Sequence, residues 1–253
     1  MAAPSGRGNI SLGLKKLGAF ILTRLPFASA VVFALLCHER ESNERPLGYP
    51  HIVIYIHVAL LMLEGSMMSF ATQRSLFALM CAVQIAVMML VTHTSPSLRY
   101  KPWLMIRMLS RDLGVIGSYL ILASRTHEEL SRRYRLAKLY PLGRSLLASY
   151  FIVLAFQLNR EAVEQDAFVH HIPGGIVAVS AFCGACMVCS LMFLSQYKVK
   201  PAVRVLIVLG LLFTVMVDLD FKYWKRRHVE YWNQVTILVN DLGMVAMLLL
   251  LAT

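Results

Sequence analysis

The segment Tyr231-Trp-Asn-Gln-Val-Thr-Ile-Leu-Val-Asn-Asp-Leu-Gly-Met-Val-Ala-Met-Leu-Leu-Leu-Leu-Ala252 is apolar along its length, with a few polar side chains set into it. A helix needs about 20 predominantly apolar residues to cross the hydrocarbon core of a bilayer. This segment therefore predicts a membrane-spanning helix, and similar runs fill the rest of the chain. The eight predicted spans are 18–37, 51–70, 75–92, 103–123, 143–158, 174–195, 202–219 and 230–252.

The composition agrees with a membrane protein built only of helices. The 253 residues are 58% hydrophobic and 15% charged, whereas soluble domains carry about 25% charged residues. Eight spans joined by short loops leave no room for a separate domain outside the membrane. In a soluble protein, the net charge of +11 would suggest nucleic acid as the partner. In a membrane protein, an excess of basic residues instead indicates which loops face the cytosol. We therefore predict membrane lipids as partners and no nucleic acid.

Basic residues predict the orientation of the chain. Lys and Arg are more frequent on the side that holds the N-terminus and the loop 124–142, and short loops rich in these residues face the cytosol. An even number of spans then predicts that both termini are cytosolic. The same loop would lie beside anionic lipid headgroups. An endomembrane location is favoured.

Short sequence matches predict an internal repeat of four spans. Leu22-Thr-Arg-Leu-Pro-Phe-Ala-Ser-Ala30 is similar to Leu142-Gly-Arg-Ser-Leu-Leu-Ala-Ser-Tyr150, and Ser110-Arg-Asp-Leu-Gly-Val115 is similar to Val239-Asn-Asp-Leu-Gly-Met244. The members of each pair lie about half the chain apart, and a unit with an even number of spans repeats in parallel orientation. We predict a four-helix repeat over 1–123, a basic cytosolic connecting loop over 124–142 and a second four-helix repeat over 143–253.

These features resemble two groups of membrane proteins. An Arg early in the first span and a polar, Gly-containing fourth span resemble the DoxX-like four-helix fold, whose doubled form includes the surfeit-locus cargo receptors. The chain resembles the transmembrane protein 101 family more specifically. The segments that carry this second resemblance are Leu22–Phe27, Met68–Phe70, Phe77–Leu79, Ile106–Arg111, Ile121–Ser124, His171–Gly175, Phe193–Ser195 and Val229–Gln234.

The resemblances imply two different functions. The transmembrane protein 101 family implies a non-enzymatic multi-pass protein that modulates signalling through NF-κB activation. The DoxX-like fold implies instead a secretory-pathway protein that handles cargo or lipid, with a polar cavity between the repeats. The family defines no catalytic residues, and the sequence contains no nucleophile–base pair or nucleotide-binding loop. Cys183-x-x-Cys186-x-x-Cys189 lies within an apolar run and spreads around a helix, so we predict neither a metal nor a cofactor.

Polar side chains inside the predicted spans are the candidate site. Charged residues in a membrane span are energetically costly and usually face the interior of a helix bundle. Arg107 and Arg111 lie one turn apart on one helix face, and Asp241 lies on the polar face of the last span. If the two halves are related as the repeat predicts, the polar faces of the fourth and eighth spans meet, and Arg111 pairs with Asp241. We call these polar faces together the polar stripe. The candidate residues are Arg24, Glu64, Arg107, Arg111, Asp112, Arg144, Asp218, Asn240 and Asp241.

Three interpretations of this stripe remain open from the sequence. The charges can neutralise one another and hold helices together. Arg107 and Arg111 can bind an anionic or zwitterionic headgroup, or the stripe can conduct protons or ions. Outside the spans, the acids Glu161, Glu164 and Asp166 are predicted to be solvated loop residues. Trp103, Trp224 and Trp232 are predicted to form an aromatic belt at the membrane interface.

Overall fold

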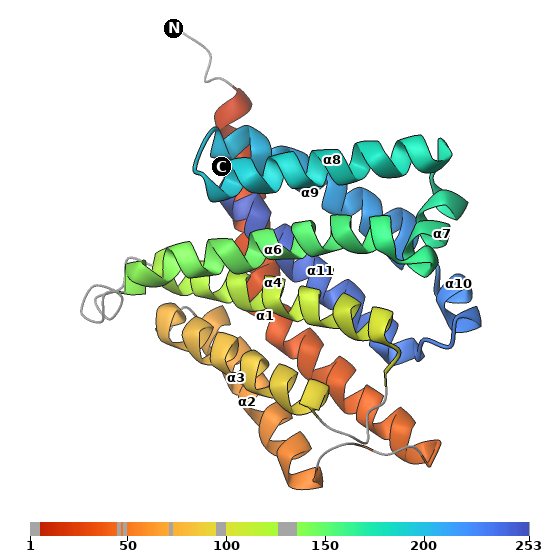
Figure 1. The fold of residues 1–253 in the computed structure, drawn as a ribbon. Helices are drawn as coiled ribbons and strands as arrows, with labels where there is room; N and C mark the ends of the chain where they lie inside the picture. The colour runs from red at the N-terminus through yellow and green to blue at the C-terminus, as the bar shows by residue number, and fades with distance from the viewer. Residues whose placement is uncertain are drawn as a thin grey trace, which may run out of the picture.

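The computed structural model describes residues 6–44, 47, 50–70, 73–94, 100–125 and 136–252, and every regular element in these ranges is a helix (Figure 1). Four short elements lie between the long helices: η1 (Leu136–Lys138), α7 (Ala162–His171), the π-helical turn η2 (Thr214–Asp218) and α10 (Phe221–Arg226). The long helices are α1 (Gly6–Ser42), α2 (His51–Ser69), α3 (Arg74–Thr94), α4 (Pro102–Arg125), α6 (Leu139–Arg160), α8 (Gly175–Leu194), α9 (Val199–Phe213) and α11 (Tyr231–Ala252).

Each long helix overlaps one of the eight predicted apolar runs, and seven of them, with α9 continued by η2, are long and apolar enough to cross a membrane. The eighth, α4, has 24 residues and is therefore about 36 Å long. It carries Arg107, Arg111 and Asp112 in its N-terminal half, and these charges distinguish it from the seven apolar helices. The chain is thus an integral membrane protein with seven clearly apolar helices among its described residues, and α4 is a long, charged helix at its centre.

The helices pack in an order that differs from their order along the chain. α1 packs against α2 and α11, whereas α6 packs against α8 and α4. α3 covers α4, α9 covers α11, and α4 and α11 touch each other. In Figure 1, α2 and α3 lie on one side of the α4–α6 pair, and α8 and α9 lie on the other. The first long helix of each half of the chain therefore packs against the last long helix of the other half.

Glycines let two of these helix pairs approach very closely. A Cβ added to Gly117 on α4 would lie 2.5 Å from the carbonyl oxygen of Gly143 on α6. A Cβ added to Gly18 on α1 would lie 2.6 Å from the carbonyl oxygen of Ala246 on α11. Small residues at such crossings are typical of helix packing in membranes, where backbone contact replaces the hydrophobic effect.

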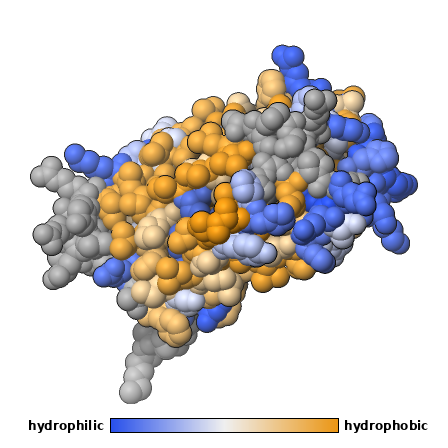
Figure 2. Space-filling view, turned by 90° about the horizontal axis from the view of Figure 1, so that it is seen from below, coloured by the Kyte–Doolittle hydropathy of each residue, from blue (hydrophilic) through white to orange (hydrophobic). Residues whose placement is uncertain are grey.

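The outer surface is apolar over the middle of the molecule. Figure 2 shows hydrophobic residues over the central part of one face and hydrophilic residues gathered at one end. Large apolar side chains on α2, α8 and α9 are exposed, among them Ile56, Val177, Val188 and Val208. Exposed apolar side chains of this kind are favourable in contact with lipid chains and unfavourable in contact with water.

The structure changes two boundaries of the predicted loops. The predicted connecting loop 124–142 is shorter, because α4 extends to Arg125 and α6 begins at Leu139, with η1 just before it. Residues 126–135 lie outside the described residues. The segment between the fifth and sixth predicted spans is not only a loop, because it folds into α7.

Candidate functional site

Two arginines and three carboxylates form an ion-pair network inside the helix bundle. Arg107 Nη1 lies 3.0 Å from Oε1 of Glu164 on α7, and Arg107 Nη2 also binds Asp218 at the end of η2. Arg111 Nη2 lies 2.7 Å from Oδ2 of Asp218, and Arg111 Nε lies 3.0 Å from Oδ1 of Asp241 on α11. Each of the five side chains is at most 2% exposed. The network therefore ties α4 to three other elements in the interior of the protein.

Neutral groups add hydrogen bonds to the network, in which Arg107 Nε alone of the guanidinium nitrogens is buried without a partner. The hydroxyl of Tyr150 on α6 donates to Asp241 Oδ1 at 3.2 Å, and the hydroxyl of Thr214 donates to Asp241 Oδ2 at 3.3 Å. Arg111 Nη1 donates to the backbone carbonyl of Arg107 at 3.0 Å. Buried charges are tolerated when they are paired and hydrogen-bonded in this way.

Trp224 on α10 covers one end of the network. Its ring centroid lies 3.5 Å from the guanidinium carbon of Arg107, a cation–π contact. Its indole N–H donates to the carbonyl of Val217 at 2.9 Å, and the side-chain amide of Gln234 donates to the carbonyl of Asp218 at 2.6 Å. These bonds satisfy backbone carbonyls at the end of the π-helical turn, and they hold Asp218 against both arginines.

The network contains more negative than positive groups. Two guanidinium groups face three carboxyl groups, so the formal charge is −1 when all five are ionised. An uncompensated charge in a medium of low polarity is costly. The carboxylates occupy both terminal nitrogens of Arg107 and two of the three side-chain nitrogens of Arg111. Every charged group of the network thus has at least one partner of opposite charge, and the ion pairs connect four elements.

The pairing predicted from the helix faces is present. Arg111 binds Asp241, and the side-chain amide of Asn240 donates to Asp112 Oδ1 at 2.9 Å. These two contacts cross the same α4–α11 interface in opposite directions, since Arg111 and Asp112 are neighbours on α4, and Asn240 and Asp241 are neighbours on α11.

Three predicted site residues lie away from this network. Arg24 on α1 is exposed, with its guanidinium 3.9 Å from the ring centroid of Phe20. Arg144 on α6 is 8% exposed and lies near the ring of Tyr140. Glu64 on α2 is 1% exposed and lies beside Cys81 on α3.

Two predictions for residues outside the spans or at their ends are wrong. Glu164 is not a solvated loop residue: it is buried because α7 folds back against α6, α8 and η2 and delivers its carboxylate to Arg107. The aromatic belt is wrong for two of its three tryptophans: Trp224 is 1% exposed and lies on Arg107, and Trp103 is 9% exposed, with its ring centroid 6.0 Å from that of Trp224. The spacing of the spans carries no signal for either contact, because both depend on how short helices between the spans dock.

A second cluster surrounds Arg40 near the end of α1. Arg40 Nη2 lies 3.0 Å from Oε2 of Glu230 and 3.4 Å from Oδ1 of Asn233, and it also binds the hydroxyl of Tyr100. The remaining terminal nitrogen, Nη1, is buried and has no hydrogen-bond partner. Arg40 lies outside the predicted span 18–37, and its burial at 2% exposure therefore adds a site residue that the sequence did not indicate.

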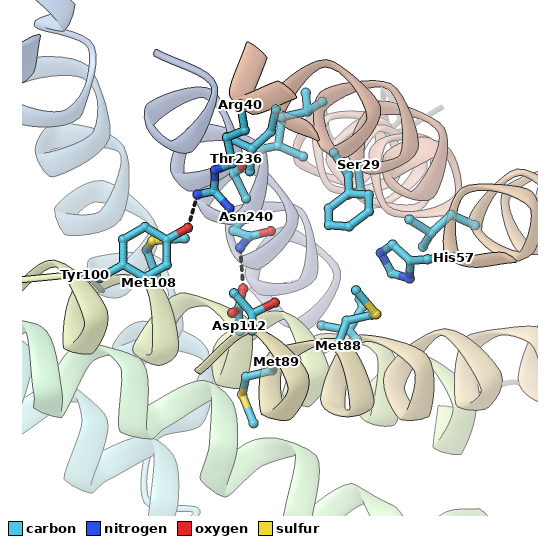
Figure 3. Close-up of a pocket in the computed structure, with 17 residues that line it drawn as sticks. Ser29, Arg40, His57, Met88, Met89, Tyr100, Met108, Asp112, Thr236 and Asn240 are labelled. Carbon is cyan, nitrogen blue, oxygen red and sulfur yellow. Dashed lines mark hydrogen bonds between the residues drawn. The ribbon is translucent and has the colours of Figure 1, made fainter. Parts of the chain in front are cut away.

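Arg40 lines a cavity of about 110 Å³ between α1, α2, α3, α4 and α11. In Figure 3, Arg40, Tyr100, Asn240 and Asp112 gather on one side of the cavity, and His57 lies on the other. Most of the wall between them is apolar. The apolar lining residues are Val32, Phe33, Leu36, Leu61, Ile85, Met88, Met89, Met108 and Val239.

An ion pair outside the spans joins α7 to α10. His171 Nε2 lies 2.9 Å from Oδ2 of Asp220, and the backbone N–H of Tyr223 donates to Asp220 Oδ1 at 2.9 Å. The hydrogen bonds from His171 and from this backbone N–H hold the pKa of Asp220 below its ordinary value of 3.8. A carboxyl group whose pKa is lowered by folding stabilises the folded state at higher pH, and this contribution disappears as the pH falls through the lowered pKa.

We therefore expect the Asp220→Asn variant to be less stable than the wild type at pH 6, with the difference in Tm shrinking toward zero as the pH falls below 3.8. Asparagine still accepts the hydrogen bond from Tyr223, so the comparison isolates the charge. Thermal unfolding of the detergent-solubilised protein between pH 6 and pH 3 measures the difference. A difference that stays constant over this range would contradict the assignment.

The described residues contain no group of three or more His, Cys, Asp or Glu side chains that could hold a metal ion. Cys183, Cys186 and Cys189 are free, and the thiol of Cys183 donates to the carbonyl of Ala155.

Comparison with known proteins identifies the family. No solved structure matches the chain. The sequence model of one family matches residues 9–253, nearly the whole chain. This match confirms the resemblance carried by the short motifs, and the chain belongs to the TMEM101 protein family.

Proposed function

We propose that this membrane protein is a non-enzymatic binding protein that holds a lipid-like molecule in the cavity beside Arg40. The observation that carries the proposal is the cavity itself, which has apolar walls and a polar end within the helix bundle. Sites for small molecules are mostly apolar and contain a few polar groups that fix orientation. Arg107 and Arg111, the other candidate site, are already occupied by carboxylates.

The position of the cavity favours a ligand that enters from the membrane. Ser29 and Arg40 both line the cavity and are 11 residues apart on α1, which corresponds to roughly 16 Å along a helix. The cavity therefore extends far into the depth of the bilayer. Phe33, Ile85 and Met89 in its wall are half-buried, which supports an opening toward the lipid.

Our proposal includes eight spans arranged as two four-helix halves. Its support is the reciprocal packing, in which α1 contacts α11 and α6 contacts α4. The crossed bonds Arg111–Asp241 and Asn240–Asp112 have the same reciprocal character, as expected at a two-fold axis. With α4 as the eighth span, both termini lie on one side, and the basic residues favour the cytosol.

A blocked cavity tests the binding function. We expect a long-chain alcohol with a photoreactive diazirine in its chain to label peptides of α1 and α3 in the purified protein, and excess unlabelled alcohol to compete. Met88→Trp fills the cavity and should reduce this labelling at least fivefold, because Met88 is buried in its wall. The matched control is Met80→Trp, on the exposed face of the same helix. Labelling that is neither competed nor reduced by Met88→Trp would refute the proposal.

The signalling function remains a separate prediction that rests on the family resemblance. It predicts that expression of the chain raises the activity of an NF-κB reporter in cells. If Met88→Trp retains this activity while labelling is lost, the two functions are independent.

A further inference from the structure

Two residues that line the polar end of the cavity have hydrogen-bonding capacity that is not fully used, Arg40 as a donor and Asp112 as an acceptor. The donor is Arg40 Nη1, which is buried and has no partner although the rest of the guanidinium binds Glu230, Tyr100 and Asn233. Asp112 Oδ1 accepts from Asn240, while Asp112 Oδ2 lies 3.7 Å from His93, too far for a hydrogen bond. Both Arg40 and Asp112 line the cavity.

A buried donor without a partner is energetically unfavourable. A ligand that accepts a hydrogen bond from Arg40 Nη1 would remove this penalty, and a ligand that also donates to Asp112 would use both groups. A hydroxyl group can do both, because it carries one donor hydrogen and two acceptor lone pairs.

The groups at this end of the cavity favour a neutral head. The positive charge of Arg40 is balanced by Glu230 at 3.0 Å, so a carboxylate head gains little from Arg40, cannot donate to Asp112 and would be repelled by it. An ammonium head can pair with Asp112, but it has no acceptor for Arg40 Nη1. A hydroxyl head serves both groups without adding a charge.

The size of the cavity sets a limit on the apolar part of the ligand. Its volume of about 110 Å³ is somewhat smaller than an engineered cavity of about 150 Å³ that holds one benzene molecule. The cavity thus has room for one chain segment or one ring. The rest of a longer chain would extend through the opening toward the lipid.

We infer that the cavity selects a neutral amphiphile with a hydroxyl head and a single apolar chain, whose hydroxyl bonds to Arg40 and Asp112. This inference rests on the proposed function, because it specifies which lipid-like molecule the cavity holds. It assigns Arg40 and Asp112 as the residues that determine the head group.

Three photoreactive probes with the same diazirine-bearing chain test the inference: a long-chain alcohol, the corresponding carboxylic acid and the corresponding amine. In the full-length protein in detergent, we expect the alcohol to label α1 and α3 about tenfold more strongly than the acid or the amine at equal concentration. A bond to a charged group contributes about this factor. This comparison uses the wild type, so it does not depend on the folding of a variant.

Arg40→Lys tests the role of the donor. Lysine keeps the positive charge beside Glu230 but lacks the second terminal nitrogen, so we expect labelling by the alcohol to fall about tenfold while labelling by the acid and amine stays low. The control is Arg227→Lys, an exposed arginine paired with Asp166, which should leave labelling unchanged.

The outcomes separate the two proposals. Equal labelling of the cavity by all three probes, unchanged in Arg40→Lys, would overturn the choice of head group and leave the binding function standing. Strongest labelling by the acid or the amine would also overturn it. If no probe labels the cavity above the level of Met88→Trp, the binding function itself fails.

Discussion

Replacing Arg111 with methionine should lower the free energy of unfolding by about 3–5 kcal/mol, because the change removes one partner from a buried ion-pair network. Arg111 binds both Asp218 and Asp241. Without it, a single arginine faces three carboxyl groups, and Asp241 keeps only the hydroxyls of Tyr150 and Thr214. Thermal unfolding of the detergent-solubilised protein, followed by fluorescence-detected size-exclusion chromatography, measures the loss.

A second substitution should restore part of this stability. Adding Asp241→Asn to Arg111→Met returns the charge balance of the network to that of the wild type, so the double variant should be more stable than the Arg111→Met single variant. Such non-additivity is expected for residues in one network. Arg227→Met is the control, because Arg227 forms an exposed pair with Asp166, and such pairs contribute only about 0–1 kcal/mol. The network has no stabilising role if Arg111→Met is as stable as this control.

Removing the ring of Trp224 is the second change with a large expected effect. Trp224 is 1% exposed, contacts Arg107 and binds the carbonyl of Val217. Truncation of a buried Trp to Ala costs about 3–5 kcal/mol, and here it also opens the end of the network. Trp224→Phe keeps an aromatic ring over Arg107 and loses only the indole hydrogen bond, so its loss should be smaller.

Trp232→Ala is the matched control for this experiment, because Trp232 is only half-buried on α11. We expect Trp232→Ala to lower the Tm much less than Trp224→Ala does. Equal losses in the two variants would show that Trp224 contributes no more than an ordinary aromatic residue at the membrane surface.

The helical periodicity of the sequence was enough to predict the centre of the network. Arg107 and Arg111 share one face of α4, Asp241 lies on the polar face of α11, and buried charges need opposite charges. These facts together predicted the Arg111–Asp241 contact, which is present at 3.0 Å. The eight apolar runs also predicted the existence of the eight long helices, because length and hydropathy are local properties of the chain. Their bounds were less accurate: α1 begins at Gly6, 12 residues before the predicted run 18–37.

Other parts of the site depend on tertiary contacts and could not be predicted. Glu164 lies in a short polar helix whose sequence resembles that of a solvated loop, and only the docking of α7 buries it. Arg24 and Arg107 both lie in predicted spans, yet one is exposed and the other is buried. The apolar residues around Arg24 surround α1 on all sides, so the sequence has no face that marks the core.

The contact between α1 and α11 has a consequence for how the protein is made. During synthesis, α1 enters the membrane first, but the helix against which Gly18 packs is the last of the long helices to follow. Until then, the backbone groove at Gly18 faces lipid or another membrane protein. The α4–α6 pair closes much earlier, because its helices are neighbours along the chain. The α1–α11 contact therefore forms only after the last of the described long helices has been made, later than the contacts between helices that are neighbours along the chain.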